Sequence, residues 1–212
     1  RWMAVYGLKR QDAVQIEKTV PGVKRVLPML TKRMNAVHGA REVDCQLIGT
    51  FPYYPEFTQA EMVVGQFLNE EEENSKVSSC VISLPLAERL FAGHNPLLEK
   101  IVVRGYESSQ VFQVKGVLQE RVDAEKLPQL ADSLGRTITA NVYVPLSTFN
   151  ALYGVKNVDR SVGNLKLEAV ELTEIRVEFE SVEQVLSSLP LIHEALRSGR
   201  DERDFEIVVP IR

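Results

Sequence analysis

The sequence predicts an α+β fold, in which helix-plus-strand segments at both chain ends flank a strand-rich middle. Two periodicities carry this prediction. Apolar residues recur at helical spacing over residues 11–19 and 182–196, whereas residues 174–179 alternate between polar and apolar. Helical spacing places apolar side chains on one face of a helix, and alternation places them on one face of a strand. With 212 residues, 44% of them hydrophobic, the chain can bury a substantial core.

The N-terminal segment predicts a short helix followed by a long β-hairpin. Residues 11–19 have helical spacing, and the helix ends before Pro21 because the residue preceding a proline avoids helical geometry. Residues 23–37 and 42–50 then have the composition of two strands, joined by a turn at His38-Gly39.

Residues 51–67 are rich in aromatic residues and proline, and we expect an irregular connection there. The candidate partner-contact patch consists of four aromatic residues of this segment: Phe51, Tyr53, Tyr54 and Phe57. Aromatic side chains dominate the cores of protein interfaces, but a small satellite core under a long loop is the favoured alternative for these four. Asn69 and the glutamates 70–73 follow this segment. A run of glutamates can bind a cation, but we predict a solvated loop here, because charge runs are usually solvated.

The middle of the chain predicts alternating strands and one helix. Pro85 opens the helix, since a proline is tolerated in the first helical turn, and Gly93 closes it. Gly116 indicates a bulge or the close approach of another backbone segment. The predicted strands lie at residues 77–83, 100–105 and 111–118.

Residues 119–140 have the composition of a variable connection, after which a strand at 141–145 leads into a short helix. We expect Ser147 to cap that helix and Gly154 to end it.

The C-terminal third predicts strands on either side of a helix. Ser181 and Gln184 form a capping box for that helix, and Gly199 ends it. Pro190 interrupts the pattern, so a kink or a two-part helix is expected. The apolar stripe consists of Val182, Val185, Leu186, Leu189, Ile192 and Leu196. The predicted strands lie at residues 165–169, 175–179 and 205–209.

The chemistry-bearing residues form no recognisable catalytic, cofactor or metal constellation. Cys45 and Cys80 lie in apolar contexts typical of buried free thiols, although a disulfide between them stays open. His38, His94 and His193 lack the neighbours of a nucleophile or of a zinc site. The net charge of −4 argues against nucleic-acid binding. We therefore expect no enzymatic activity, no cofactor and no metal; the alternative is a soluble enzyme with an unrecognised site.

The chain ends predict a segment of a longer polypeptide, with a processed mature protein as the alternative. The chain starts at Arg1 without methionine or a signal-peptide pattern, and no apolar stretch approaches the ~20 residues needed to span a bilayer. Trp2 and Tyr6 fit a membrane-interface position, where amphipathic aromatic rings are enriched.

An ordered series of short motifs runs through nearly the whole chain. In order, they are Tyr6-Gly7-Leu8, Val20-Pro21-Gly22-Val23, Ile48-Gly49-Thr50, Gly65-Gln66-Phe67-Leu68, Ala87-Glu88-Arg89-Leu90-Phe91, Phe112-Gln113-Val114-Lys115-Gly116-Val117-Leu118, Val142-Tyr143-Val144-Pro145-Leu146 and Asp204-Phe205-Glu206-Ile207. This series resembles the extracytoplasmic core domain of MacB-type ABC transporter permeases, a family related to the FtsX and LolC/LolE permeases.

The resemblance implies a porter-like α/β subdomain from residues 1–48 and 147–212, with an inserted, mostly β, Sabre-like subdomain at 49–146. It implies a periplasmic domain, tethered at both ends to the inner membrane, that relays ATP-driven rearrangement and hydrolyses no ATP itself. The implied partners are an ABC nucleotide-binding subunit, a second permease copy and a membrane fusion protein. We expect a monomer in isolation. The alternative implied by the family is the partner-binding module of a non-transporting, FtsX-like regulator.

Overall fold

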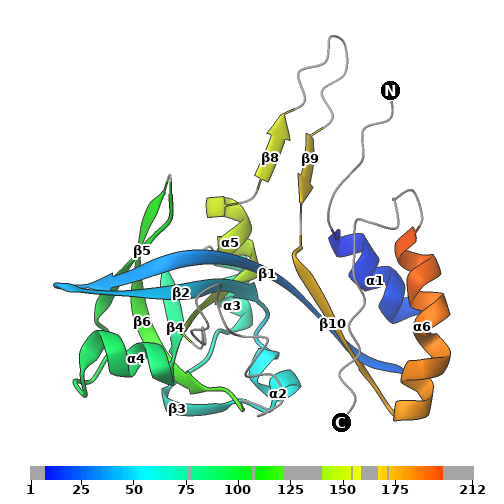
Figure 1. Cartoon of the computed structure of the whole chain (residues 1–212), viewed down its shortest axis with the longest axis horizontal. Helices are drawn as coiled ribbons and strands as arrows, with labels where there is room; N and C mark the ends of the chain where they lie inside the picture. The colour runs from blue at the N-terminus through cyan, green and yellow to red at the C-terminus, as the bar shows by residue number, and fades with distance from the viewer. Residues whose placement is uncertain are drawn as a thin grey trace. The chain divides into compact units, whose positions relative to one another are not determined.

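The chain folds into two compact units, which a computed structural model describes over residues 8–75, 78–106, 108–121, 140–153, 155–158, 167–170 and 172–197 (Figure 1). The described residues up to Met29 and from Tyr153 onward form unit 1, and Leu30–Leu152 form unit 2. Helices and strands both contribute, so the predicted α+β class is confirmed. The division into porter-like and Sabre-like subdomains at residues 48/49 and 146/147 stays a prediction.

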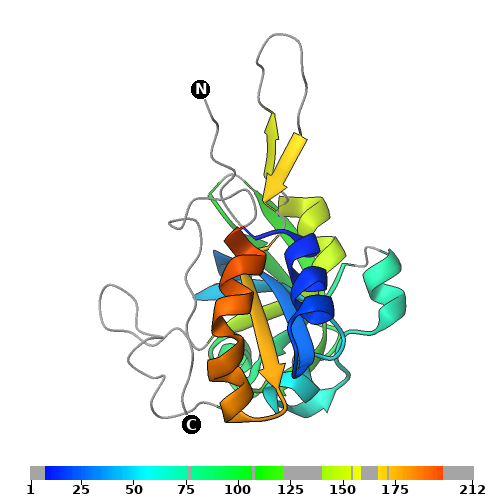
Figure 2. The same cartoon turned by 90° about the vertical axis from the view of Figure 1, so that its right-hand side faces the viewer.

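Unit 1 packs helices against a strand pair. Helix α1 (Arg10–Thr19) and helix α6 (Val182–Arg197) contact each other and lie side by side (Figure 2). Strand β10 (Glu174–Phe179) pairs antiparallel with the first half of β1 (Val23–His38). Two short strands, β8 (Val155–Val158) and β9 (Leu167–Val170), pair with each other, and β8 was not predicted. The helices bury Ala13, Ile16, Ile192 and Leu196.

The turn after α1 is shaped by contact with α6. Gly22 has a φ of +77°, which favours glycine, and a Cβ there would lie 2.6 Å from the Gln184 side chain. The Ser188 hydroxyl donates to the Pro21 carbonyl over 3.2 Å. Helix α6 runs through Pro190 as one helix, so the predicted two-part helix is wrong. Leu186 of the predicted buried stripe is 58% exposed.

Half of the predicted capping box of α6 is present, because the Gln184 N–H donates to the Ser181 hydroxyl over 3.3 Å. The return bond is missing among the described residues, since the Gln184 side-chain oxygen is buried without a hydrogen-bond partner there. Several other predictions fall outside the described residues: the final strand at 205–209, its preceding Gly199, the helix-ending Gly154, and the N-terminal Trp2 and Tyr6.

Unit 2 is built on six strands whose pairings close on themselves (Figure 1). The second half of β1 pairs with β2 (Arg41–Thr50), and β2 pairs in turn with β7 (Asn141–Pro145). Strand β7 pairs with β4 (Ser79–Ser83), and β4 pairs with β6 (Ser109–Gln119). Strand β6 pairs with β5 (Lys100–Arg104), which pairs with β1 and so closes the ring. Ring closure leaves these six strands without a free edge over the paired residues.

The predicted β-hairpin of β1 and β2 is confirmed, with His38 opposite Arg41 and Gly39 in the turn at a φ of +57°. Helix α4 (Leu84–Phe91) is also as predicted: Pro85 lies in its first turn, and Ala92 and Gly93 end it with positive φ. Its buried face consists of Leu86, Ala87, Leu90 and Phe91.

Two segments of unit 2 differ from the sequence prediction. Residues 51–67, expected to be irregular, contain helix α2 (Tyr54–Thr58) and strand β3 (Glu61–Gly65), which pairs with β6. The glutamate run forms helix α3 (Glu70–Ser75) instead of a loop. Helix α5 (Leu146–Tyr153) begins one residue before Ser147, so the prediction of Ser147 as the residue that caps it is wrong.

Candidate functional site

The structure pairs two motif glycines that are distant in the sequence. Gly65 of β3 lies opposite Gly116 of β6. A Cβ on Gly116 would lie 2.5 Å from the Gln66 carbonyl oxygen, and a Cβ on Gly65 would collide with the Lys115 carbonyl oxygen. The β4–β6 register also shifts next to Gly116. The predicted bulge or close backbone approach at Gly116 is therefore confirmed.

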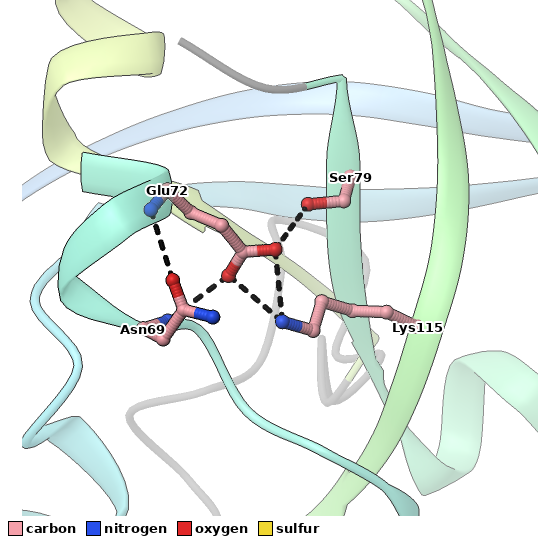
Figure 3. A network of polar contacts seen from close by, with 4 residues as sticks. All are labelled: Asn69, Glu72, Ser79 and Lys115. Carbon is pink, nitrogen blue, oxygen red and sulfur yellow. Dashed lines mark hydrogen bonds and ion pairs between the residues drawn. The ribbon is translucent and has the colours of Figure 1, made fainter. Parts of the chain in front are cut away.

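An ion pair joins the glutamate run to the neighbouring strand (Figure 3). The Lys115 ammonium lies 2.8 Å from both carboxylate oxygens of Glu72, and the Ser79 hydroxyl donates to the same carboxylate over 2.9 Å. The two charged side chains are only 19% and 13% exposed. Glu72 therefore ties α3 to β4 and β6 at once.

Glu72 also forms a reciprocal cap with Asn69 at the start of α3 (Figure 3). Each backbone N–H donates to the other residue's side-chain oxygen over 2.9 Å. Burial alone would raise the pKa of Glu72, but the hydrogen bonds from Lys115, Asn69 and Ser79 outweigh it, and the net pKa is lowered. The carboxylate is thus held ionised by its partners.

Glu73, the next residue, caps helix α5. The Ser147 N–H donates to the two Glu73 carboxylate oxygens, at 3.1 and 3.3 Å, and the Ser147 hydroxyl donates to the Glu73 backbone carbonyl. A carboxylate at this position satisfies an N–H that the helix leaves unpaired and complements the helix dipole. The predicted solvated loop at Glu70–Glu73 is wrong because Glu72 and Glu73 make these bonds.

The four aromatic residues of the candidate contact patch are placed differently from one another. Tyr54 is 2% exposed and belongs to the core. Phe51 and Tyr53 are half-buried and stacked, with ring centroids 5.6 Å apart, and Phe57 is half-buried. Partner contact by this patch stays a prediction, and Tyr54 is too deeply buried to take part in it.

Tyr54 belongs to a buried polar cluster between α2, β6 and β7. Its hydroxyl and that of Tyr143 each donate to the same Glu120 carboxylate oxygen over 2.5 Å, and the Asn141 amide donates to the other oxygen over 3.2 Å. The Phe67 ring lies 6.0 Å from each tyrosine ring. Burial raises the pKa of Tyr143, so its hydroxyl stays a proton donor. This packing is that of a satellite core.

The cysteines and the histidines of unit 2 take structural positions. Cys45 and Cys80 are buried free thiols; burial raises the pKa of Cys45 to about 12 and that of Cys80 higher still. The His38 ring packs on the Phe91 ring, with the ring centroids 4.4 Å apart, and the His94 Nδ1 lies 2.8 Å from the Phe91 carbonyl oxygen. Within the described residues, no three His, Cys, Asp or Glu side chains lie close enough to hold a metal ion, and no helix there is long and apolar enough to cross a membrane.

Comparison with known proteins decides the family. The model of the MacB-like periplasmic core domain matches residues 4–190. The chain belongs to the MacB-like periplasmic core domain family. Similar curated proteins are the macrolide export ATP-binding/permease protein MacB of Syntrophobacter fumaroxidans, 23% identical over 86% of this chain, and the pyoverdine export ATP-binding/permease protein PvdT of Pseudomonas aeruginosa, 22% identical over 96%. The chain spans only 28% and 27% of these two proteins.

Two solved structures share the fold of this chain. The extracellular domain of the noncanonic ABC-type transporter YknZ from Gram-positive bacteria has a TM-score of 0.62 at 22% identity, covering 92% of this chain and 86% of that one. The periplasmic region of MacB from Actinobacillus actinomycetemcomitans has a TM-score of 0.59 at 19% identity, covering 92% and 75%.

The residues that sequence reasoning missed are Glu72, Glu73 and Lys115. One local signal was available, because Asn69 followed three residues later by Glu72 has the spacing of a capping box, which predicts a helix start. The partners Lys115 and Ser147 lie 43 and 74 residues away along the chain, and no local pattern indicates such contacts.

Proposed function

We propose that this MacB-like periplasmic core domain is the extracytoplasmic part of an ABC transporter permease and relays ATP-driven conformational change to export or extract a substrate. The observation that carries the proposal is the family match over residues 4–190, together with export ATP-binding/permease relatives of which the chain covers about a quarter. ATP hydrolysis then takes place in a nucleotide-binding domain outside this chain.

The division of the chain supports a mechanical role. Both ends of the chain belong to unit 1, and unit 2 is formed by one continuous segment. The chain enters unit 2 within β1 and leaves it at the end of α5, so both crossings lie in regular secondary structure. A strand and a helix transmit displacement better than a flexible linker does, because their backbone hydrogen bonds resist bending and extension.

The proposal includes partners and a location. The domain lies in the periplasm, tethered to the inner membrane through the rest of the permease. It works with an ABC nucleotide-binding subunit and a second permease copy, and in tripartite assemblies with a membrane fusion protein. The nucleotide-binding partner is supported by the relatives, which are ATP-binding/permease proteins, and the second permease copy and the fusion protein are part of the proposal.

The test is a distance measurement in the full-length permease with its nucleotide-binding subunit in nanodiscs. Spin labels go on cysteines substituted at Leu186 of unit 1 and Val111 of unit 2, which are 58% and 46% exposed. Cys45 and Cys80 are buried and stay unlabelled, and any cysteine elsewhere in the permease is replaced by serine. We expect the distance distribution to differ between the nucleotide-free and the ATP–vanadate states.

The control pair lies within unit 2, at Val63 and Val111, and its distance should not change. An unchanged distance for the 186–111 pair in every nucleotide state would contradict the relay. The sequence of the parent reading frame separates the transporter from a secreted binding module. One apolar segment of ~20 residues before Arg1 and three after Arg212 are expected, whereas a signal peptide and an immediate stop contradict the transporter.

A further inference from the structure

We infer that the outer edge of strand β3 binds a second copy of this chain, by antiparallel pairing of the two β3 strands across a two-fold axis at Val63. This inference rests on the proposed function, in which two permease copies work together, and it names the surface through which the two domains meet. The contact has two parts, which are the open edge of β3 and the exposed side chain of Leu98.

Strand β3 is an edge strand with an apolar surface. Among the described residues, it pairs with β6 on one side and with no strand on the other (Figure 1). Val63 and Val64 are 50% and 37% exposed. An open edge attracts a further strand unless charges block it, and the one charged residue of β3 is Glu61 at its first position. The centre of this edge is therefore open to a further strand.

The sequence of β3 is complementary to itself. In an antiparallel pair centred on Val63, Met62 lies opposite Val64 of the second copy, and Glu61 lies opposite Gly65. Apolar residues thus meet apolar residues. The two glutamates, which would repel each other if they were opposite, lie at the two ends of the pair. Both copies use the same patch, as a two-fold interface requires.

A bulge in β3 favours a second copy over a different strand. The register with β6 shifts between Met62 and Val64, so Val63 is an extra residue on β3. A regular strand loses register on passing a bulged one, because the bulge sets two residues against one. Two copies of β3 carry the bulge at the same place, on the two-fold axis, and stay in register on both sides of it. An extended segment of another protein lacks this match.

Leu98 continues the surface beyond the end of β3. Its N–H donates to the Val114 carbonyl of β6 over 2.8 Å, and the side chain of Leu97 next to it lies 2.9 Å from the Cβ position of Gly65. Leu98 therefore lies close to the last residue of β3, along the same strand β6. In the antiparallel pair, the residues that precede Glu61 of the second copy extend past this end and reach Leu98.

Leu98 has an unfavourable backbone conformation and is nevertheless exposed. Its φ is +68°, which favours glycine and is rare for leucine, and the residue is 74% exposed. Two bonds fix this conformation on β6, because its N–H donates to Val114 and its carbonyl accepts from the Gln113 amide over 3.0 Å. Backbone strain of this kind is concentrated at functional sites. A leucine held in this way is a preorganised apolar contact for the second copy.

The small size of the contact is consistent with the expected monomer in isolation. Stable interfaces use about 20–30 residues on each side, whereas this contact uses the five residues of β3 together with Leu98. In the permease, the membrane segments hold the two copies at an effective concentration of about a millimolar, at which a small contact forms. We therefore expect the pairing in the assembled permease and not in a dilute solution of the domain.

The test is disulfide cross-linking in the full-length permease in nanodiscs, with every cysteine outside this chain replaced by serine. Val63→Cys places two thiols opposite each other across the two-fold axis, at a strand-pair separation that a disulfide can bridge. The matched control is Val111→Cys, the same substitution at a residue of similar exposure (46%) on β6, outside the proposed contact. We expect mild oxidation to cross-link about fivefold more of the Val63→Cys permease than of the control.

Leu98→Gly, combined with Val63→Cys, separates a binding role of Leu98 from a structural one. Glycine keeps both backbone bonds and relieves the unfavourable φ, so the urea midpoint of the 212-residue chain should not fall. The cross-linked fraction should drop about threefold, because an apolar contact is lost. A role of Leu98 in folding alone would lower the midpoint and leave the cross-linked fraction unchanged, and this result would remove Leu98 from the contact.

Equal cross-linking of Val63→Cys and Val111→Cys would overturn the pairing, and so would a cross-link from Val63→Cys to a protein other than the permease. The relay is tested separately, because the 186–111 labels leave β3 unmodified. A Val63 cross-link without any change of that distance would refute the proposed function and keep the contact. A changed distance without the cross-link would refute the contact alone.

Discussion

Replacing Lys115 by methionine tests whether the Glu72–Lys115 ion pair stabilises unit 2. The substitution keeps the length of the side chain and removes its charge, so a carboxylate that is 13% exposed loses its cation. Breaking a fully buried pair costs about 3–5 kcal/mol, and an exposed pair contributes about 0–1 kcal/mol. Glu72 retains its bonds to Ser79 and Asn69, and we expect a loss of about 2 kcal/mol in the free energy of unfolding.

The assay is urea unfolding of the 212-residue chain at pH 7, followed by far-UV circular dichroism. A loss of about 2 kcal/mol lowers the midpoint by roughly 1 M urea for a typical slope. The control is Lys100→Met, the same change at an exposed lysine of the adjacent strand β5, with an expected effect below about 0.5 kcal/mol. Equal midpoints for the two variants would refute the reasoning.

The effect of Lys115→Met should also depend on pH. The pKa of Glu72 is lowered in the folded state, so its ionised form stabilises the fold above the unfolded pKa of about 4.3. This stabilisation is lost as the pH falls through the folded pKa. The difference between wild type and Lys115→Met should therefore be full at pH 7 and shrink below about pH 4. A difference that grows in acid would show that the pair is not the cause.

Three further outcomes follow from the packing of unit 2. Gly116→Ala should lower the free energy of unfolding by more than about 2 kcal/mol, because the added Cβ would lie 2.5 Å from the Gln66 carbonyl oxygen. An unchanged free energy of unfolding would mean that β3 can move away at little cost. Tyr54→Phe should lower the free energy of unfolding by about 1–2 kcal/mol in the same urea assay, since it removes one donor from the half-buried Glu120 carboxylate. An unchanged midpoint would exclude that bond as a source of stability. Cys45 and Cys80 should react with Ellman's reagent only in urea, because both are buried and their pKa values are raised; rapid reaction in buffer would contradict their burial.

Local signals predicted those elements whose formation depends on neighbouring residues. Helix α4 is an example, since Pro85, the apolar stripe and Gly93 all lie within ten residues, and the structure follows each of them. The hairpin of β1 and β2 was predictable for the same reason, because its two strands are joined by a short turn at Gly39. The motif series likewise indicated the family that the comparison then showed.

Long-range contacts decided the remainder. The glutamate run became a helix because Asn69 starts it locally and because Lys115 and Ser147 supply partners that no sequence window contains. Closure of the sheet depends on pairing between Asn35 and Arg104, which only the folded chain brings opposite each other.

The sequence by itself determined the α+β class, the order of most helices and strands, and membership of the MacB-like family, because periodicity, capping residues and short motifs act over a few residues. The tertiary structure alone decided that Tyr54 is core and that Glu72 and Glu73 connect the sheet to α5. A glutamate has the same local sequence signature whether its carboxylate meets water or a lysine from another strand. Its role is fixed only when folding brings the two charges together.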